Sequence, residues 1–186
     1  MDYKFLITSV LSIQLPGGGI GKDGKTLYSF KDIPEDKEIF QRHTKETDMF
    51  SGARTFSSFW KPPLADRNNI VISRTGEFPF KEKAHDILPN LVAALAYYGR
   101  KNPETNKTIV GGKMLYDEAF PLSHQIAVTE IKGTREADTF VELPLNDFFI
   151  YTTGPWKTAT CQNGEVVSYR EVLYRNKKFF TEPADE

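Results

Sequence analysis

Pro34–Thr44 has the sequence PEDKEIFQRHT, and the rest of the chain is organised around this stretch. Proline suits the first position of a helix, because its missing N–H would have no partner there. Glu35 and Asp36 follow in the first turn, where carboxylates complement the positive helix end. Ile39 and Phe40, with a histidine one turn later, recur at helical spacing. The stretch therefore predicts a short helix with one apolar face.

Asp36 is the first candidate functional residue. It lies four residues before Phe40, so both side chains project from the same face of the helix. A carboxylate beside a buried ring is partly desolvated and needs a specific partner. The alternative is an exposed acid that only complements the helix dipole. Glu35 is the neighbouring carboxylate and a second candidate.

The composition is that of an ordinary globular chain. With 186 residues, 39% hydrophobic and 26% charged, it suits one domain whose core is large enough to be stable without disulfides or a structural metal. The net charge of −1 argues against a general nucleic-acid binder. Cys161 is the single cysteine, so no internal disulfide can form and a reducing compartment fits.

The apolar run Phe5–Leu11 raises the question of a signal peptide. It has one lysine before it and leads into a proline and three glycines without a small-residue cleavage site, so a buried strand fits better. No run is long enough to span a bilayer. We expect a cytoplasmic protein.

Strand-like and helix-like segments alternate along the chain. Apolar or β-branched runs predict strands at Tyr3–Leu11, Thr47–Ser51, Asn69–Ser73, Thr108–Gly112, Gln125–Ile131, Phe148–Thr153 and Val166–Tyr174. Further helices are predicted at residues 52–59, at Pro89–Tyr98 with Gly99 as its stop, and from Lys113 to about Phe120. Leu15–Lys25 is glycine-rich and predicts a loop, and Asn163-Gly164 predicts a turn.

This order predicts an α/β fold in a single domain over residues 1–176. The first two thirds have the strand–helix alternation of a parallel sheet, and the last third has the hairpins of an antiparallel one. We expect a central, twisted, mainly parallel sheet with an antiparallel C-terminal edge, flanked by helices. Residues 177–186 are acidic at their end and predict a frayed tail.

Two glycine motifs predict an anion site. Gly111-Gly112 lies between a buried strand and a helix, where a group can approach the backbone closely and face the helix N–H groups. Gly52-Ala53-Arg54-Thr55 repeats the arrangement, and Ser73-Arg74 follows a third strand. Ligands of open α/β sheets bind at these strand ends, so an elongated anion such as a pyrophosphate fits between the motifs. The alternative for each glycine motif is a tight turn.

Several short motifs follow one another at characteristic spacing. They are Gly19–Gly24, Pro34–Asp36 with Phe40 and Thr44, Gly52 with Thr55-Phe56, Pro63-Leu64 with Arg67, Asn69–Arg74, Val110–Gly112 with Tyr116, Thr129–Ile131, and Asp138–Phe140. Their order and spacing resemble the dihydrofolate reductase family over nearly the whole chain, from about Tyr3 to Arg175. The resemblance implies reduction of 7,8-dihydrofolate to 5,6,7,8-tetrahydrofolate by hydride transfer from NADPH, in one-carbon metabolism and nucleotide synthesis.

The resemblance places Asp36 at the family's catalytic position, ahead of Glu35. A pterin presents a ring N–H and an exocyclic amine side by side, and one carboxylate can accept both as a fork. Asp36 would orient the pterin and favour protonation of its N5, in a pocket dry enough to raise the carboxyl pKa. Thr129 would hydrogen-bond Asp36 and hold its geometry.

The resemblance also implies the substrate site. Phe40 would stack on the substrate and Leu64 would line the same slot, although Phe40 is equally explained as core. Arg67 would pair with the folate glutamate carboxylate, with a surface salt bridge as the alternative. Val110 and Tyr116 would border the nicotinamide. We expect a monomer that binds dihydrofolate and antifolate inhibitors, without nucleic-acid or membrane partners.

The implied cofactor is NADPH. Ile20 and Gly21 would lie beside the nicotinamide in a lid loop, and residues from about 47 to 104 would form the lobe for the adenosine. The remaining implied cofactor contacts are Gly52, Arg54, Thr55, Ser73, Arg74, Gly111, Gly112, Lys113, Met114 and Leu115. No metal is implied, because paired cysteines are absent and the three histidines are scattered.

The chain departs from the family at its lid. The family's Leu-Pro-Trp before the acid helix is missing from Thr26–Asp32, which leaves Leu27, Tyr28 or Phe30 as substitutes for the tryptophan. The usual basic residue after the second phosphate glycine is an alanine here, so a preference for NADPH over NADH rests on Arg54 and Arg74.

Three other functions remain open, and a nucleic-acid or metal-binding module is the least favoured of them, because cysteines are not paired and the histidines are scattered. A reductase of the same fold, acting on a pyrimidine intermediate of riboflavin synthesis, would keep the NADPH features but has less need of Asp36, Phe40 and Arg67 together. A structural or assembly protein that retains the fold without turnover is another, because the lid is altered.

Overall fold

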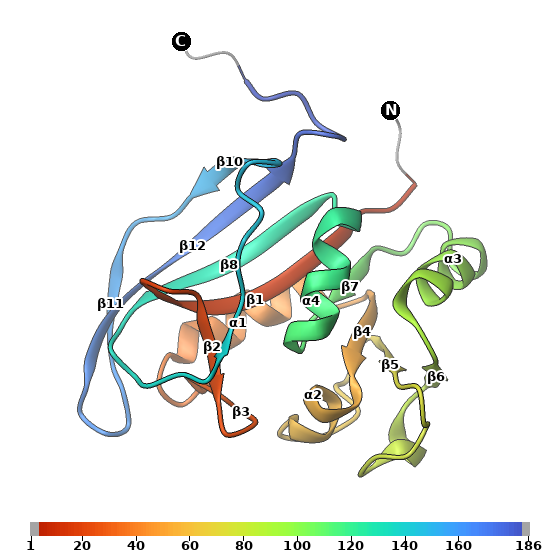
Figure 1. Cartoon of the computed structure of the whole chain (residues 1–186), viewed down its shortest axis with the longest axis horizontal. Coiled ribbons are helices and arrows are strands. Elements are labelled where there is room, and N and C mark those ends of the chain that lie inside the picture. Colours follow the sequence, from red (N-terminus) through yellow and green to blue (C-terminus); the bar gives the residue numbers. More distant parts are fainter. Residues whose placement is uncertain (1–3, 184–186) are drawn as a thin grey trace.

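A computed structural model describes residues 4–183, which form one twisted sheet with helices on both faces (Figure 1). The strands are β1 (Ile7–Leu15), β2 (Gly19–Lys22), β3 (Lys25–Thr26), β4 (Asp48–Gly52), β5 (Asn68–Ile72), β6 (Asp86–Leu88), β7 (Lys107–Ile109), β8 (Gln125–Lys132), β9 (Thr139–Phe140), β10 (Phe148–Thr153), β11 (Lys157–Thr160) and β12 (Val166–Asn176). The helices are α1 (Pro34–Thr44), α2 (Ala53–Ser58), α3 (Leu91–Lys101) and α4 (Lys113–Ala119), with 3₁₀ turns at Lys81–Lys83 and Phe120–Leu122.

The sheet confirms the predicted topology. Its strand order is β10-β12-β8-β1-β7-β4-β5-β6. All neighbours from β8 to β6 are parallel, whereas β12 pairs antiparallel with β8 and β10. The carboxyl ends of β1, β4, β5 and β7 therefore meet at one edge of the sheet, where ligands of α/β proteins bind.

Alternation along β1 divides the two faces of the sheet. Leu11 and Ile13 belong to the main apolar cluster, which also contains the inward residues of α3 and α4. Val10 lies in a separate apolar cluster, against which Phe40 of α1 packs. Ser12 shares the α1 side with Val10, because successive strand residues face opposite ways. This division puts α1 on the face of the sheet opposite α3 and α4.

The first strand and the glycine-rich segment differ from the prediction. β1 begins at Ile7 and continues to Leu15, because its parallel ladder with β8 runs to that residue; Tyr3 lies outside the described residues. Leu15–Lys25 is not a loop, since it contains β2 and the start of β3. Its glycines serve close packing: a Cβ on Gly21 would lie 2.9 Å from the carbonyl oxygen of Lys25.

The third helix also differs from its prediction. α3 continues past Gly99 to Lys101, and the Asn90 side chain caps its start by accepting from the Ala93 N–H at 2.8 Å. Gly99 does not end the helix. A Cβ there would lie 3.2 Å from the ring of Phe5, so the glycine makes room for a neighbouring side chain.

The other predicted helices and strands are confirmed to within a few residues. The prediction missed five short strands, β2, β3, β6, β9 and β11. All of them except β2 consist of two to four exposed or half-buried residues, which gives a weak apolar pattern. The predicted turn at Asn163-Gly164 joins β11 to β12, and Gly164 has a φ of +85°.

The described part of the predicted tail packs against the domain. The ring of Phe179 lies 4.4 Å from that of His124, and Phe180 lies 4.7 Å from the Arg175 guanidinium carbon. Residues 184–186 lie outside the described residues.

A buried ion pair joins β4 and β7 at the end of the sheet opposite the predicted site. Lys107 Nζ lies 2.9 Å from Asp48 Oδ2, and both side chains are fully buried. The ammonium also donates to the Asn102 and Thr105 carbonyl oxygens. The side-chain amides of Asn68 and Asn102 donate to the carboxylate. Both charges thus have the additional hydrogen bonds that a buried pair requires.

We expect Asp48→Asn to lower the free energy of unfolding by about 3–5 kcal/mol, because it leaves the Lys107 ammonium buried without its counter-charge. Urea denaturation followed by circular dichroism measures this. Asp66→Asn is the matched control, since Asp66 pairs with Lys45 at an exposed site and should cost about 1 kcal/mol or less. Similar losses in both variants would contradict the expectation.

Candidate active site

Asp36 is buried in the first turn of α1 and faces the sheet. It is 6% exposed. Ser12 Oγ of β1 lies 2.9 Å and 2.8 Å from its two carboxylate oxygens, and the Thr129 hydroxyl of β8 also hydrogen-bonds it. Burial raises the pKa of the Asp36 carboxyl above its usual value, while the two hydroxyls lower it in part. This is a desolvated acid held by two neutral donors.

A second carboxylate lies behind Asp36 on the same side of the sheet. Glu171 of β12 also raises the pKa of Asp36 through its negative charge. It is paired with two residues of α1: His43 Nε2 lies 2.7 Å from one of its oxygens, and Arg42 contacts the other. These partners keep the Glu171 charge compensated.

The structure distinguishes Asp36 from its neighbour Glu35. Glu35 is paired with Lys157 of β11 and accepts a hydrogen bond from the Tyr169 hydroxyl. These contacts lower the pKa of Glu35. Glu35 therefore belongs to a peripheral ion pair, and Asp36 is the carboxylate that faces the interior.

The predicted apolar wall of the substrate site is assembled in one place. Leu64 and Val110 belong to the buried cluster that contains Val10, and Phe40 packs against it. Tyr116 of α4 is buried beside the wall and donates to the Val10 carbonyl oxygen at 2.8 Å. Phe40 is only half-buried, so part of its ring remains available to a ligand.

Arg67 lies at the carboxyl-terminal end of α1. Its Nε donates to the Ala65 carbonyl oxygen at 2.8 Å and its Nη1 to Thr44 Oγ1 at 2.5 Å. Burial lowers its pKa. Two of the five guanidinium N–H donors are thereby used, and no ion pair to Arg67 occurs within residues 4–183. A surface salt bridge does not explain this arginine.

An aromatic group forms the rim of the site. The Phe30 ring lies 5.7 Å from Phe40 and 5.3 Å from Trp60, which is 52% exposed. Lys37 Nζ lies 5.3 Å from the Trp60 ring centroid. Among the three candidates for the missing tryptophan, Phe30 is thus the one beside the site. Leu27 and Tyr28 pack in a different apolar cluster.

The two glycine motifs meet at the edge of the sheet, as predicted. The Gly52 N–H donates to the Gly111 carbonyl oxygen at 2.7 Å. A Cβ on Gly111, whose φ is +104°, would lie 2.9 Å from the Tyr116 ring, and one on Gly112 would lie 3.4 Å from Thr55 Oγ1. The Gly111–Gly112 peptide bond is cis. The bare backbone here offers a surface that a phosphate can approach closely.

The basic residues of the predicted cofactor site lie around this surface. Arg54 and Arg74 are exposed, and neither has a carboxylate within ion-pair distance in the described chain. Ser73 Oγ accepts the Gly76 N–H in the turn beside Arg74.

The start of α4 carries three residues of the predicted cofactor site, Lys113, Met114 and Leu115. Lys113 is paired with Asp117 at 2.7 Å, and Met114 is 79% exposed. The Leu115 side chain lies in the main core, and its N–H donates to the Gly112 carbonyl oxygen. A cofactor role for Leu115 remains a prediction that rests on its position alone.

The predicted lid is a hairpin of β2 and β3. Half-buried Ile20 packs against the main core. The Gly21 carbonyl oxygen accepts the Asp138 N–H at 3.0 Å, and Asp138 Oδ2 accepts the Asp23 N–H at 2.8 Å. A Cβ on Gly24 would lie 3.9 Å from Arg54 Cδ, so the hairpin tip reaches the predicted phosphate site.

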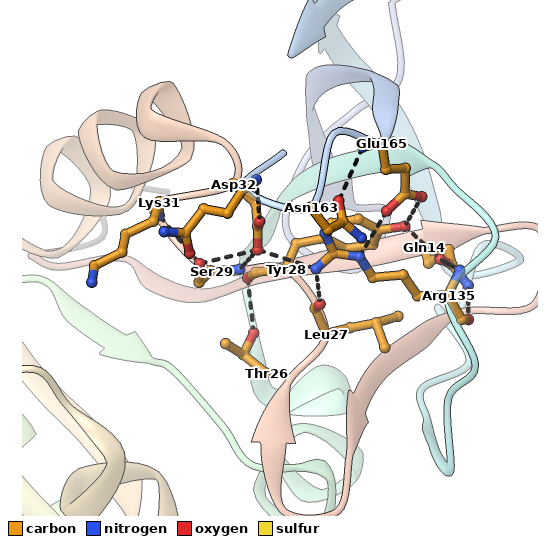
Figure 2. Close-up of polar contacts among 11 residues, drawn as sticks. Gln14, Thr26, Leu27, Tyr28, Ser29, Lys31, Asp32, Arg135, Asn163 and Glu165 are labelled. Atoms are coloured by element: carbon orange, nitrogen blue, oxygen red, sulfur yellow. Dashed lines mark hydrogen bonds and ion pairs between the residues drawn. The ribbon is translucent and has the colours of Figure 1, made fainter. Parts of the chain in front are cut away.

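The segment between the lid and α1 is held by a polar cluster around Arg135 (Figure 2). The guanidinium donates to Leu27 O at 2.8 Å, pairs with Asp32 at 3.1 Å and with Glu165 at 2.8 Å, and lies 4.2 Å from the Tyr28 ring. Gln14 completes the cluster by accepting from the Tyr28 hydroxyl and the Arg135 N–H.

Gly133 provides the space for Tyr28 in this cluster. A Cβ on Gly133 would lie 1.8 Å from the Tyr28 hydroxyl. We expect Gly133→Ala to lower the free energy of unfolding by about 1–3 kcal/mol, as overpacking does, and to cost less in a Tyr28→Phe background. Denaturant unfolding measures both values.

Gly154→Ala is the control for this comparison, because a Cβ there would have its nearest neighbour at 3.4 Å. An equal cost of Gly133→Ala in both backgrounds would show that the Tyr28 hydroxyl is not the obstacle.

Sequence reasoning missed Ser12 and Trp60. Ser12 is one serine within an apolar strand, and no spacing relates it to Asp36. Its role follows only from the packing of α1 against β1. Trp60 lies beyond the second helix and meets Phe30 through the tertiary fold alone.

The described residues contain no helix that is long and apolar enough to cross a membrane. Within the same residues, no three His, Cys, Asp or Glu side chains are grouped so that they could hold a metal ion.

Comparisons with known proteins agree on one family. A family model described as Dihydrofolate reductase matches residues 7–169. A dihydrofolate reductase of Gallus gallus is 33% identical over 175 residues, covering 84% of this chain and 89% of that protein. One of Mycobacterium leprae is 27% identical over 154 residues, covering 81% and 88%. One of Drosophila melanogaster is 32% identical over 133 residues, covering 66% and 71%.

Proposed function

Because this chain belongs to the dihydrofolate reductase family, we propose that it reduces 7,8-dihydrofolate to 5,6,7,8-tetrahydrofolate with NADPH. The observation that carries the proposal is the buried Asp36 carboxylate, which lies beside an apolar wall and near a glycine-lined anion surface. The proposal includes a monomeric, cytoplasmic enzyme of one-carbon metabolism that also binds antifolates.

Asp36 is the residue that orients the pterin. A carboxylate in a desolvated site accepts a ring N–H and an exocyclic amine as a charge-assisted fork. The orientation of the ring and the negative charge favour protonation at N5. Thr129 holds the carboxylate in place from β8. Phe40, Leu64 and Val110 supply the apolar surface on which the substrate rings lie.

Arg67 binds the glutamate end of the substrate. Its bonds to Ala65 and Thr44 fix the guanidinium, and three of its five donors remain for a carboxylate. The rim residue Phe30 adds an aromatic contact near Phe40. Rigid placement of the donors lowers the entropy cost of binding.

The residues around the glycine surface fit NADPH, which supplies the hydride when bound. Gly52, Gly111 and Gly112 leave the backbone bare for the pyrophosphate. Arg54, Thr55, Ser73 and Arg74 surround it, in a lobe that spans residues from about 47 to 104. Ile20 and Gly21 of the lid and Tyr116 of α4 border the nicotinamide and exclude water from it.

We expect Asp36→Asn to lower turnover about 100-fold or more, because the amide cannot provide the carboxylate's charge, while NADPH binding stays intact. NADPH oxidation on addition of dihydrofolate measures turnover, and quenching of protein fluorescence measures cofactor binding. Glu35→Gln is the matched control, since Glu35 is held by Lys157 and Tyr169. Loss of turnover in the control and not in Asp36→Asn would contradict the assignment. A wild-type protein that binds NADPH but not dihydrofolate would favour the riboflavin-pathway reductase.

We expect Arg74→Ala to narrow the preference for NADPH over NADH by roughly ten-fold or more. A charge-assisted contact to the extra phosphate contributes about 1.5–3 kcal/mol. The ratio of kcat/KM for the two cofactors measures the preference. Arg100→Ala, at the end of α3, is the control. An unchanged ratio in Arg74→Ala would remove this arginine from the site.

A further inference from the structure

Ser12 has an unusual place relative to Asp36. Its Oγ lies 2.9 Å from Oδ1 and 2.8 Å from Oδ2 of the same carboxylate. An atom almost equidistant from both oxygens at hydrogen-bonding angles lies in front of the carboxylate, between them. A serine hydroxyl carries one hydrogen, so it shares that single donor between the two oxygens. The forked pair of N–H donors of a pterin needs the same position.

The fold explains why a serine is there. Leu11 and Ile13 pack into the core on the other face of β1, so Ser12 is directed towards α1. Its partner across the parallel ladder is Thr129 of β8. Two neighbouring strands thus present two hydroxyls to one carboxylate. Thr129 is 2% exposed, whereas Ser12 is only half-buried.

We propose that Ser12 is a positioning residue that holds the ionised Asp36 carboxylate in place of the ligand and yields this position when the ligand binds. The inference rests on the proposed function, since it assumes a ligand with two adjacent N–H donors. A serine has three staggered side-chain rotamers, so the hydroxyl can turn away without movement of the backbone. Thr129 stays on the carboxylate throughout.

The replacement of the Ser12 hydroxyl by the ligand predicts which pH profile of the enzyme depends on Ser12. Its hydroxyl donates to the charged form of Asp36 and favours ionisation before the ligand binds. After binding, the fork replaces that donor. The pH dependence of kcat/KM reports the unliganded enzyme and that of kcat reports the complex. Removal of the hydroxyl should therefore change the first profile and leave the second unchanged.

Other charged and titratable groups surround Asp36, and the substitutions of Ser12 must leave their contacts unchanged. Glu171 and Tyr169 face it from β12, and Tyr116 faces it from α4. Arg42 and His43 of α1 act through Glu171. None of them contacts Ser12 by a hydrogen bond in the described residues. Their titration is common to all the variants compared.

The test is Ser12→Ala, with the Asp36 carboxyl titrated by ¹³C NMR without ligand. We expect the pKa of Asp36 to rise by about 1 pH unit or more, as when a hydrogen bond to a charged group is lost. The midpoint of the kcat/KM profile should move to higher pH by the same amount, while the kcat profile stays in place. Ser12→Cys keeps a side chain of similar shape but makes it a weaker hydrogen-bond donor. It should move the pKa of Asp36 and the midpoint of the kcat/KM profile in the same direction as Ser12→Ala does.

Ser9→Ala is the matched control. Ser9 lies on the same strand, is fully buried, and hydrogen-bonds the Ser123 hydroxyl at 2.9 Å, away from Asp36. It should lower stability without a change in either profile. If Ser9→Ala moves the kcat/KM profile as much as Ser12→Ala does, the effect is a general one of β1 and the proposal fails.

Two results would overturn the proposal directly. An unchanged pKa of Asp36 in Ser12→Ala and Ser12→Cys would show that the hydroxyl does not hold the carboxylate. Equal movement of the kcat and kcat/KM profiles would show that Ser12 stays on Asp36 in the complex, so that nothing is exchanged. Wild-type protein without dihydrofolate turnover would instead refute the proposed function, and the NMR titration alone would then decide the role of Ser12.

Discussion

The burial of one carboxylate is the constraint on which the site depends. Asp36 is 6% exposed, and its charge is tolerated only because hydroxyls from two strands reach it. This requires β1 and β8 to be adjacent and in register, with Ser12 opposite Thr129. It also requires α1 to begin at Pro34, which sets the first turn against these strands. The contacts of Asp36 therefore depend together on where α1 starts, on the adjacency of β1 and β8, and on the register between these two strands.

Close approach of backbone segments is the second requirement, and glycines meet it. Gly52 ends β4 and Gly111 follows β7, and the Gly52 N–H donates to the Gly111 carbonyl oxygen at the ligand edge of the sheet. Gly133 admits the Tyr28 side chain beneath the lid connection. A Cβ on Gly111 would lie 2.9 Å from the Tyr116 ring and one on Gly133 would lie 1.8 Å from the Tyr28 hydroxyl, whereas one on Gly52 would make an ordinary contact at 3.6 Å. The absence of a side chain at Gly111 and Gly133 therefore allows close packing, which explains these glycines better than backbone flexibility does.

Local patterns predicted what depends on neighbours in sequence. Pro34–Thr44 forms the expected helix because its proline, acids and apolar residues act within two turns. Gly99 was misread because its space is taken by Phe5, a residue remote in sequence. Ser12 could not be found for the same reason, since its significance arises only when α1 packs on β1. The mainly parallel sheet with its antiparallel C-terminal edge was predicted correctly, because the directions of the strands follow from the alternation of whole segments.

The lid connection, the segment between β3 and α1, is held here by a polar cluster in place of the family's tryptophan. Where the family's tryptophan is missing, the Leu27 carbonyl oxygen and Asp32 are held by the Arg135 guanidinium, which also lies on the Tyr28 ring. The side chain of Arg135 is 22% exposed, so its pairs with Asp32 and Glu165 are partly shielded from solvent and salt. Because Asp32 lies two residues before the start of α1, the same contacts that fix the lid connection also fix the start of the helix that carries Asp36.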